Sequence, residues 1–160
     1  MKLKVLALAV AGALAATPAT SGVYWRGEVT PSSVALIDFS TFARLPNGEK
    51  TFILRMLSPR GTMFNGRPIS VTSFYTAVDC DEGVVRIMGG TVFGEDAAIV
   101  SRFKSDYTPL KPQPGSSGWR HLRLVCADTD QERAKFGTFV GEASLGEAVR
   151  RFRPQAPTSD

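Results

Sequence analysis

The sequence has 160 residues, of which 43% are hydrophobic and 21% are charged, and its formal net charge is +4. A chain of this length forms one hydrophobic core, and its apolar content excludes an intrinsically disordered protein. One histidine and two cysteines exclude both a zinc site of four Cys or His ligands and a scaffold held by several disulfides. We therefore expect one globular domain.

The first segment has the three parts of a secretory signal peptide. Two lysines precede an apolar run at 5–14, and small residues follow it. Cleavage after Ala15 or Ala19 fits this pattern, so residues 1–19 are predicted to be a signal peptide. A membrane span needs about 20 apolar residues, which this run lacks. No cysteine follows either cleavage site, so we expect a periplasmic or secreted protein that is neither membrane-spanning nor lipid-anchored.

Export changes the interpretation of the positive charge, because two lysines leave with the signal peptide. The remaining charge does not predict a nucleic-acid partner. Basic residues gather in two stretches, Arg102, Lys104, Lys111, Arg120 and Arg123, and then Arg150, Arg151 and Arg153. These stretches are typical of a solvated surface, and contact with an anionic cell-surface polymer is the alternative.

The two cysteines, Cys80 and Cys126, are predicted to form a disulfide because an exported chain meets an oxidising environment. There is no Cys-x-x-Cys spacing that would lower a thiol pKa and mark a redox-active pair. We therefore interpret the bridge as structural.

The first predicted strands are short and apolar or alternating. Residues 21–32 show no pattern, whereas 34–39 is a short apolar run that suits a buried strand. Asn47-Gly48 favours a two-residue hairpin turn, so the next strand, 51–57, is expected to fold back antiparallel.

Four further strands complete the predicted sheet. They cover 71–80, 84–88, 91–93 and 97–103, separated by turns that contain glycine. Six short strands at this spacing predict a predominantly antiparallel sheet. Prolines after Tyr107 end it.

A helix is predicted after the sheet, with Ser116 or Ser117 as its N-cap. Trp119, Leu122 and Cys126 share one helical face, and the arginines between them point outward. The bridge to Cys80 would tie this helix to the sheet, which gives an α+β fold with an antiparallel sheet of about six strands.

Residues 128–160 are interpreted as an extension of the domain at 22–127. Residues 130–140 and 144–152 can form amphipathic helices, and 154–160 is predicted to be disordered.

Several local features occur in the order seen in one known family. They are Ile37-Asp38-Phe39, Phe74-Tyr75 leading to Asp79-Cys80, the Arg86 strand, Gly89-Gly90, Pro114-Gly115-Ser116 and Cys126. Over 34–127, this order resembles the surface-adhesin E-like domain of Gram-negative bacteria. The resemblance implies a small antiparallel sheet with a disulfide-linked helix, in an exported non-enzymatic protein that binds host matrix and serum proteins. The family's adhesin is lipid-anchored and lacks the extra tail, so the chain departs from it in both respects.

No complete catalytic motif is present. Ser116 and Ser117 lack the spacing of a nucleophile elbow, and nearby His121 is interpreted as a surface histidine. No phosphate-binding glycine loop is found, so no cofactor is predicted.

Acidic residues offer only weak candidates for a cation site. The sequence Asp128-x-Asp130-x-Glu132 begins like a calcium loop but lacks its glycine and final glutamate. A second acidic set lies near turns, where solvation explains it: Asp79, Asp81, Glu82, Glu95 and Asp96. No metal site is therefore predicted.

Asp38 lies in an apolar strand, and we expect it to form a structural pair with Arg55.

These observations favour an exported, non-enzymatic envelope or surface domain that binds envelope or extracellular proteins or another ligand. Candidate contacts are the aromatic residues Tyr24, Trp25, Phe64 and Tyr107. The alternatives are a small periplasmic hydrolase that uses His121, and an accessory subunit whose tail from Asp128 docks onto an envelope assembly.

Overall fold

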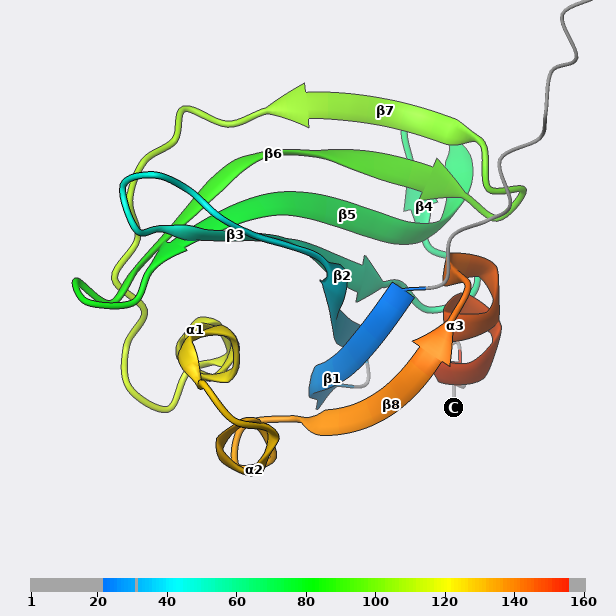
Figure 1. Cartoon of the computed structure of the whole chain (residues 1–160). Coiled ribbons are helices and arrows are strands. Elements are labelled where there is room, and N and C mark those ends of the chain that lie inside the picture. The colour runs from blue at the N-terminus through cyan, green and yellow to red at the C-terminus, as the bar shows by residue number, and fades with distance from the viewer. Residues whose placement is uncertain (1–21, 31, 156–160) are drawn as a thin grey trace, which may run out of the picture.

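The computed structural model describes residues 22–30 and 32–155, which form eight strands and three helices (Figure 1). The predicted signal peptide and residues 156–160 lie outside the described residues. The strands are β1 (Gly22–Thr30), β2 (Ser33–Arg44), β3 (Lys50–Leu57), β4 (Met63–Phe64), β5 (Arg67–Asp79), β6 (Val84–Gly94), β7 (Ile99–Lys104) and β8 (Thr138–Ala143). The helices are α1 (Ser117–Cys126), α2 (Asp130–Arg133) and α3 (Leu145–Phe152).

The sheet is antiparallel at every strand pair. Its order is β7-β6-β5-β3-β2-β1-β8, and β4 pairs with β5 outside this path. The predicted antiparallel sheet with short helices is therefore confirmed, although the described residues form eight strands and not about six. The predicted hairpin between β2 and β3 also forms, with Gly48 at a φ of 90° in a longer loop, 45–49.

Two of the predicted strands, 84–88 and 91–93, are one continuous strand in the structure. The double glycine between them does not make a turn, because Gly89 pairs with Tyr75 and Gly90 pairs with Phe74 inside the β5–β6 ladder. A Cβ atom at Gly89 would lie 2.6 Å from the Phe103 carbonyl oxygen, so glycine here allows β7 to approach closely.

The helix predicted over 130–140 is wrong, because only Asp130–Arg133 is helical and Thr138–Ala143 is strand β8, paired with β1. Glycine at 137 makes the pairing possible, since a Cβ atom there would lie 2.8 Å from the Arg26 carbonyl oxygen. The second predicted helix, at 144–152, does form as α3. The described part of the tail thus belongs to the same sheet, and a division at residue 127 does not separate two folded units.

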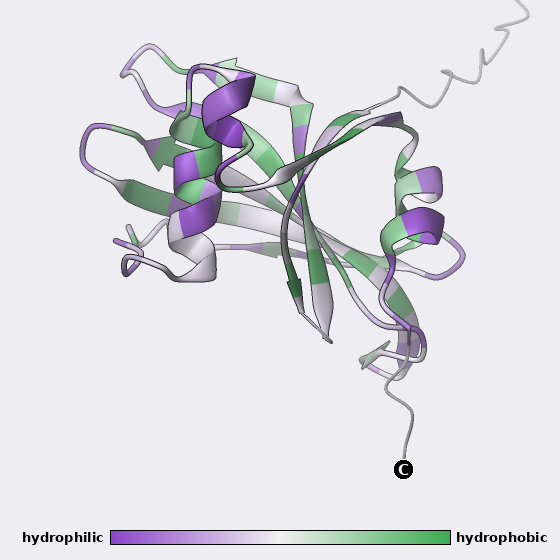
Figure 2. Ribbon diagram, turned by 90° about the horizontal axis from the view of Figure 1, so that it is seen from below, coloured by the Kyte–Doolittle hydropathy of each residue, from purple (hydrophilic) through white to green (hydrophobic). Residues whose placement is uncertain are grey.

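Two cores lie on opposite faces of the sheet, because neighbouring strand residues point to opposite sides. Trp25 and Ile37 pack with the buried face of α1, whereas the adjacent Tyr24 and Leu36 pack with Ala148 of α3. Figure 2 shows α1 and α3 on opposite sides of the strands. Register shifts in β1, β2 and β6 bend the sheet, and β8 runs along β1 from α2 to α3 (Figure 1).

Candidate functional site

The Cys80–Cys126 disulfide joins the β5–β6 turn to the C-terminal end of α1, with the two Cα atoms 5.6 Å apart. This confirms the predicted bridge. Two cavities lie on either side of it, and both are lined by the two cysteines. We call these two cavities together the disulfide cleft.

The two halves of the disulfide cleft differ in chemistry. The first half is a cavity of about 390 Å³, bounded by the loop before α1 and by α1 itself. Its lining combines apolar surface with two cations at the rim: Gly83, Lys111, Pro112, Gln113, Pro114, Trp119, Leu122 and Arg123. The second half, of about 470 Å³, is polar and carries both signs of charge: Arg44, Asn47, Gly48, Lys50, Asp79, Asp81, Glu82 and Asp128.

Short-range hydrogen bonds fix the two walls of the disulfide cleft. In the β5–β6 turn, the Asp79 carboxylate accepts hydrogen bonds from the backbone N–H groups of Asp81 and Glu82, both at 3.0 Å, which holds Cys80 in place. At the start of α1, the Ser116 hydroxyl accepts a hydrogen bond from the Trp119 N–H at 3.2 Å. Of the two predicted N-caps, Ser116 is therefore the one that forms.

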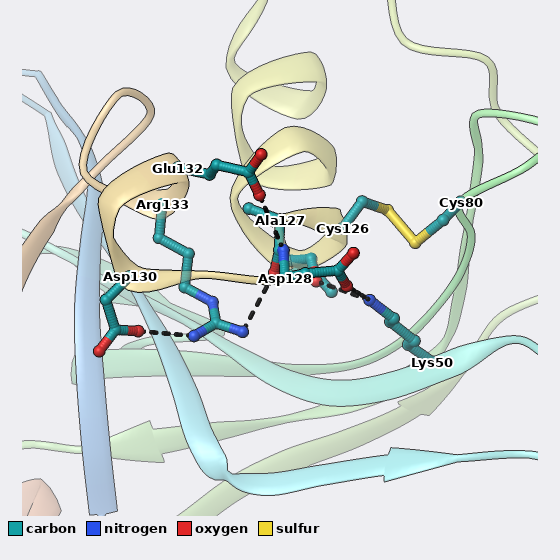
Figure 3. A network of polar contacts seen from close by, with 9 residues as sticks. Lys50, Cys80, Cys126, Ala127, Asp128, Asp130, Glu132 and Arg133 are labelled. Atoms are coloured by element: carbon teal, nitrogen blue, oxygen red, sulfur yellow. Dashed lines mark hydrogen bonds and ion pairs between the residues drawn. A yellow bond between two sulfur atoms is a disulfide. The ribbon is translucent and has the colours of Figure 1, made fainter.

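Two cations satisfy the carbonyl groups at the C-terminal end of α1 (Figure 3). Lys50 Nζ lies 3.4 Å from the Val125 carbonyl oxygen, and Arg133 donates to the Ala127 carbonyl oxygen at 3.0 Å. Carbonyl groups at this end carry partial negative charge, so both contacts stabilise the helix. Lys50 Nζ also lies 3.9 Å from the Asp128 carboxylate.

Lys50 is the site residue that sequence reasoning missed. It shares the α1-facing side of β3 with Phe52 and Leu54, and it is only 7% exposed. A lysine at a core-facing position of an apolar strand is the signal that would have found it. Its burial lowers the pKa of the amine below 10.5, opposed by the Asp128 carboxylate.

This lowered pKa predicts a specific pH dependence of stability. Between the native pKa and 10.5, the unfolded state binds more protons at Lys50 than the native state does, so this group's contribution to stability rises with pH. We expect the free energy of unfolding of the wild type to increase relative to Lys50→Met as the pH rises toward 10.5. Urea unfolding at several pH values measures this difference.

The exposed residue Lys104 provides the matched control for that measurement. Lys104→Met is expected to leave the pH profile of the wild type unchanged, because its amine lies in solvent. A Lys50→Met profile parallel to that of the wild type would contradict the role of burial at Lys50.

His121 is buried, and the interpretation of it as a surface histidine is wrong. The buried face of α1 runs through His121, Leu122, Leu124 and Val125, one position away from the predicted face. A Cβ atom at Gly27 would lie 2.7 Å from His121 Nε2, so the imidazole packs against β1. It lines an apolar cavity of about 160 Å³ between α1 and the sheet.

The acidic candidates make structural contacts. Glu132 accepts a hydrogen bond from the Asp128 N–H at 3.2 Å, and Asp130 pairs with Arg133 at 2.6 Å. The β5–β6 and β6–β7 turns keep the other acids at opposite ends of β6. Glu95 pairs with Arg153 across 2.8 Å. Within the described residues, no group of three or more His, Cys, Asp or Glu side chains is arranged to hold a metal ion.

Asp38 and Arg55 form the expected ion pair, with Arg55 Nη2 3.0 Å from Asp38 Oδ2. The Arg55 guanidinium also donates to the Ser73 hydroxyl at 2.8 Å, and the Ser40 hydroxyl donates to the Asp38 carboxylate. Burial, together with the nearby Asp38 carboxylate, raises the pKa of Tyr24 above 10. This buried polar cluster stabilises the α3 side of the sheet.

The four candidate aromatic contacts divide into two groups. Tyr24 and Trp25 are buried in the two cores, and so they are unavailable to a ligand. Phe64 and Tyr107 are 37% and 53% exposed, on β4 and in the loop after β7. Neither lines the disulfide cleft, where Trp119 is the aromatic residue.

Within the described residues, no helix is both long and apolar enough to cross a membrane. Comparison of the chain with models of known families, with curated proteins and with solved structures finds no match in any of the three.

Proposed function

We propose that this chain is an exported binding domain of the cell envelope or surface that acts without catalysis, and that the disulfide cleft is its binding surface. The observation that best supports this proposal is the apolar half of the cleft. A cavity of about 390 Å³ that combines an aromatic side chain with rim cations has the size and composition of a ligand site.

The chemistry of this cavity favours an acidic segment of a partner protein. Trp119 and Leu122 offer apolar contact for one side chain of the partner, and the Trp119 ring is held in place edge-on against Phe136, with centroids 5.7 Å apart. Lys111 and Arg123 stand at the rim, where they attract carboxylates. The resemblance to the surface-adhesin E-like domain supports an extracellular partner.

The disulfide supports the exported location. It fixes the two walls of the cleft relative to each other, and such bridges persist in oxidising compartments. A wall fixed before binding loses less entropy when the ligand binds. We therefore propose that the bridge preorganises the binding surface.

A site-specific photocrosslinker tests this function. A benzophenone amino acid replaces exposed Gln113 at the rim of the apolar cavity, and irradiation is carried out on cells that export the protein. We expect one discrete protein adduct from position 113. The same amino acid at Phe64, on β4 and far from α1 in Figure 1, provides the control and is expected to give no such adduct.

Two further variants show whether the cleft itself binds the partner. Trp119→Ala and Lys111→Glu are expected to reduce the adduct about tenfold or more, because an aromatic anchor and a complementary charge are lost. Arg120→Glu makes the same charge change on the exposed side of α1 and should leave the adduct unchanged. Equal adducts from positions 113 and 64, or an adduct insensitive to Trp119 and Lys111, would disprove the assignment.

A further inference from the structure

A separate cavity lies between α3 and the sheet, on the face opposite α1. Its volume is about 510 Å³, and we call it the α3 groove. Val71 of β5 and Phe93 of β6 form one wall, and Leu145 and Val149 of α3 form the other. Arg150 stands at its mouth. Ser70, Glu95 and Asp96 add further polar groups to the lining. Apolar walls with a few polar groups are typical of a small-molecule site, and this volume lies within the usual range of about 300–1,000 Å³.

The groove persists because α3 is held at its C-terminal end. The Arg153 guanidinium donates to the carbonyl oxygens of Ser58 and Ile69, each at 2.8 Å, and to that of Pro59 at 3.0 Å. Ala148, in the middle of α3, is completely buried against the sheet. The helix is therefore anchored by contacts outside the groove.

The charged residues that line the groove are Glu95, Asp96 and Arg150, and of these three only Arg150 lacks a salt bridge within the described residues. Glu95 pairs with Arg153 at 2.8 Å, and Asp96 pairs with Arg67 at 3.8 Å. Arg150 makes no ion pair within the part of the chain that the structure describes. Its guanidinium lies along α3, with Nη1 3.7 Å from the position of a Cβ atom at Gly146. An apolar groove with one available guanidinium is complementary to an apolar chain that ends in one negative charge.

We propose that the α3 groove binds a fatty acid, with the alkyl chain against Val71, Phe93 and Val149 and the carboxylate at Arg150. Guanidinium groups pair well with carboxylates because two parallel N–H groups match the two oxygens. This site is on the opposite face from the disulfide cleft and does not depend on the function proposed for that cleft. The chain would then carry two separate ligands.

Isothermal titration calorimetry tests the proposal. The wild type is titrated with dodecanoate below the concentration at which dodecanoate forms micelles. One saturable site is expected. Arg150→Gln should weaken dodecanoate binding about tenfold, because a charge-assisted hydrogen bond is lost, and should leave binding of uncharged dodecanol unchanged. Arg151→Gln removes the neighbouring exposed arginine, which does not line the groove, and should bind dodecanoate like the wild type.

Three results would overturn the proposal. The first is absence of saturable dodecanoate binding, as expected if a second copy of the chain covers the groove, which sedimentation would show as a dimer. The second is equal weakening by Arg150→Gln and Arg151→Gln. The third is tighter binding of lysophosphatidylglycerol than of dodecanoate, which would mean that the site recognises a phosphate headgroup.

Discussion

Removal of the Cys80–Cys126 disulfide is expected to lower the free energy of unfolding by about 4 kcal/mol. The bridge closes a loop of 46 residues that contains β6, β7 and most of α1, so its loss increases the entropy of the unfolded chain. A loss of this size is a large fraction of the stability of a typical domain. Urea unfolding of the wild type and of the Cys80→Ala, Cys126→Ala double variant measures the difference.

Reductant provides the internal control for this prediction. The wild type under reducing conditions should unfold at nearly the same urea concentration as the double variant, and the double variant should not respond to reductant. The bridge also holds the end of α1 beside Lys50, so its loss should weaken binding at the disulfide cleft. A difference below about 1 kcal/mol would contradict the loop-closure argument.

The parts of the fold that were predicted correctly are those with local signals. Alternation along 51–57 and 71–80 predicted β3 and β5, and the amphipathic pattern of 144–152 predicted α3. Strand β1 was missed because it lies inside the sheet, between β2 and β8. Its adjacent residues Tyr24 and Trp25 are both buried, on opposite faces of the sheet. A strand buried on both faces shows no alternation.

The edge strand β8 was missed for a different reason. Residues 138–143 are mostly exposed or half-buried, so their hydropathy carries little information, and their conformation depends on pairing with β1 more than a hundred residues earlier. Glycine at 141, with a φ of 92°, disfavours a helix at this position. Local propensity alone does not identify such a partner.

Of the disulfide cleft, only the disulfide itself could be predicted from the sequence. Cysteine count and export predicted the bridge, and the pattern around Asp38 predicted its pairing with Arg55. The cavities beside the bridge depend on how the loop containing Lys111 folds against α1, and that loop has no periodic signal. His121 was misplaced because the buried face was expected at Trp119, Leu122 and Cys126, whereas it lies one position earlier, through His121 and Val125.

Replacement of Arg55 by methionine is expected to destabilise the protein by about 3–5 kcal/mol. Asp38 is buried, and the substitution leaves its carboxylate without the cation, with hydrogen bonds from the Ser40 backbone N–H and hydroxyl and with the Tyr24 side chain nearby. Removal of one partner of a buried ion pair costs more than removal of both, because the remaining charge keeps its desolvation penalty. Thermal and urea unfolding measure the loss.

The Asp38→Leu, Arg55→Met double variant separates the value of the pair from the penalty of an isolated charge. Because both charges are gone, this variant is expected to recover most of the stability that Arg55→Met loses. Recovery requires that the new side chains fill the space beside Leu36 and Tyr24, which already form an apolar cluster on this face. If the double variant is as unstable as Arg55→Met, then packing around Arg55, and not the unpaired carboxylate, limits stability on the α3 side of the sheet.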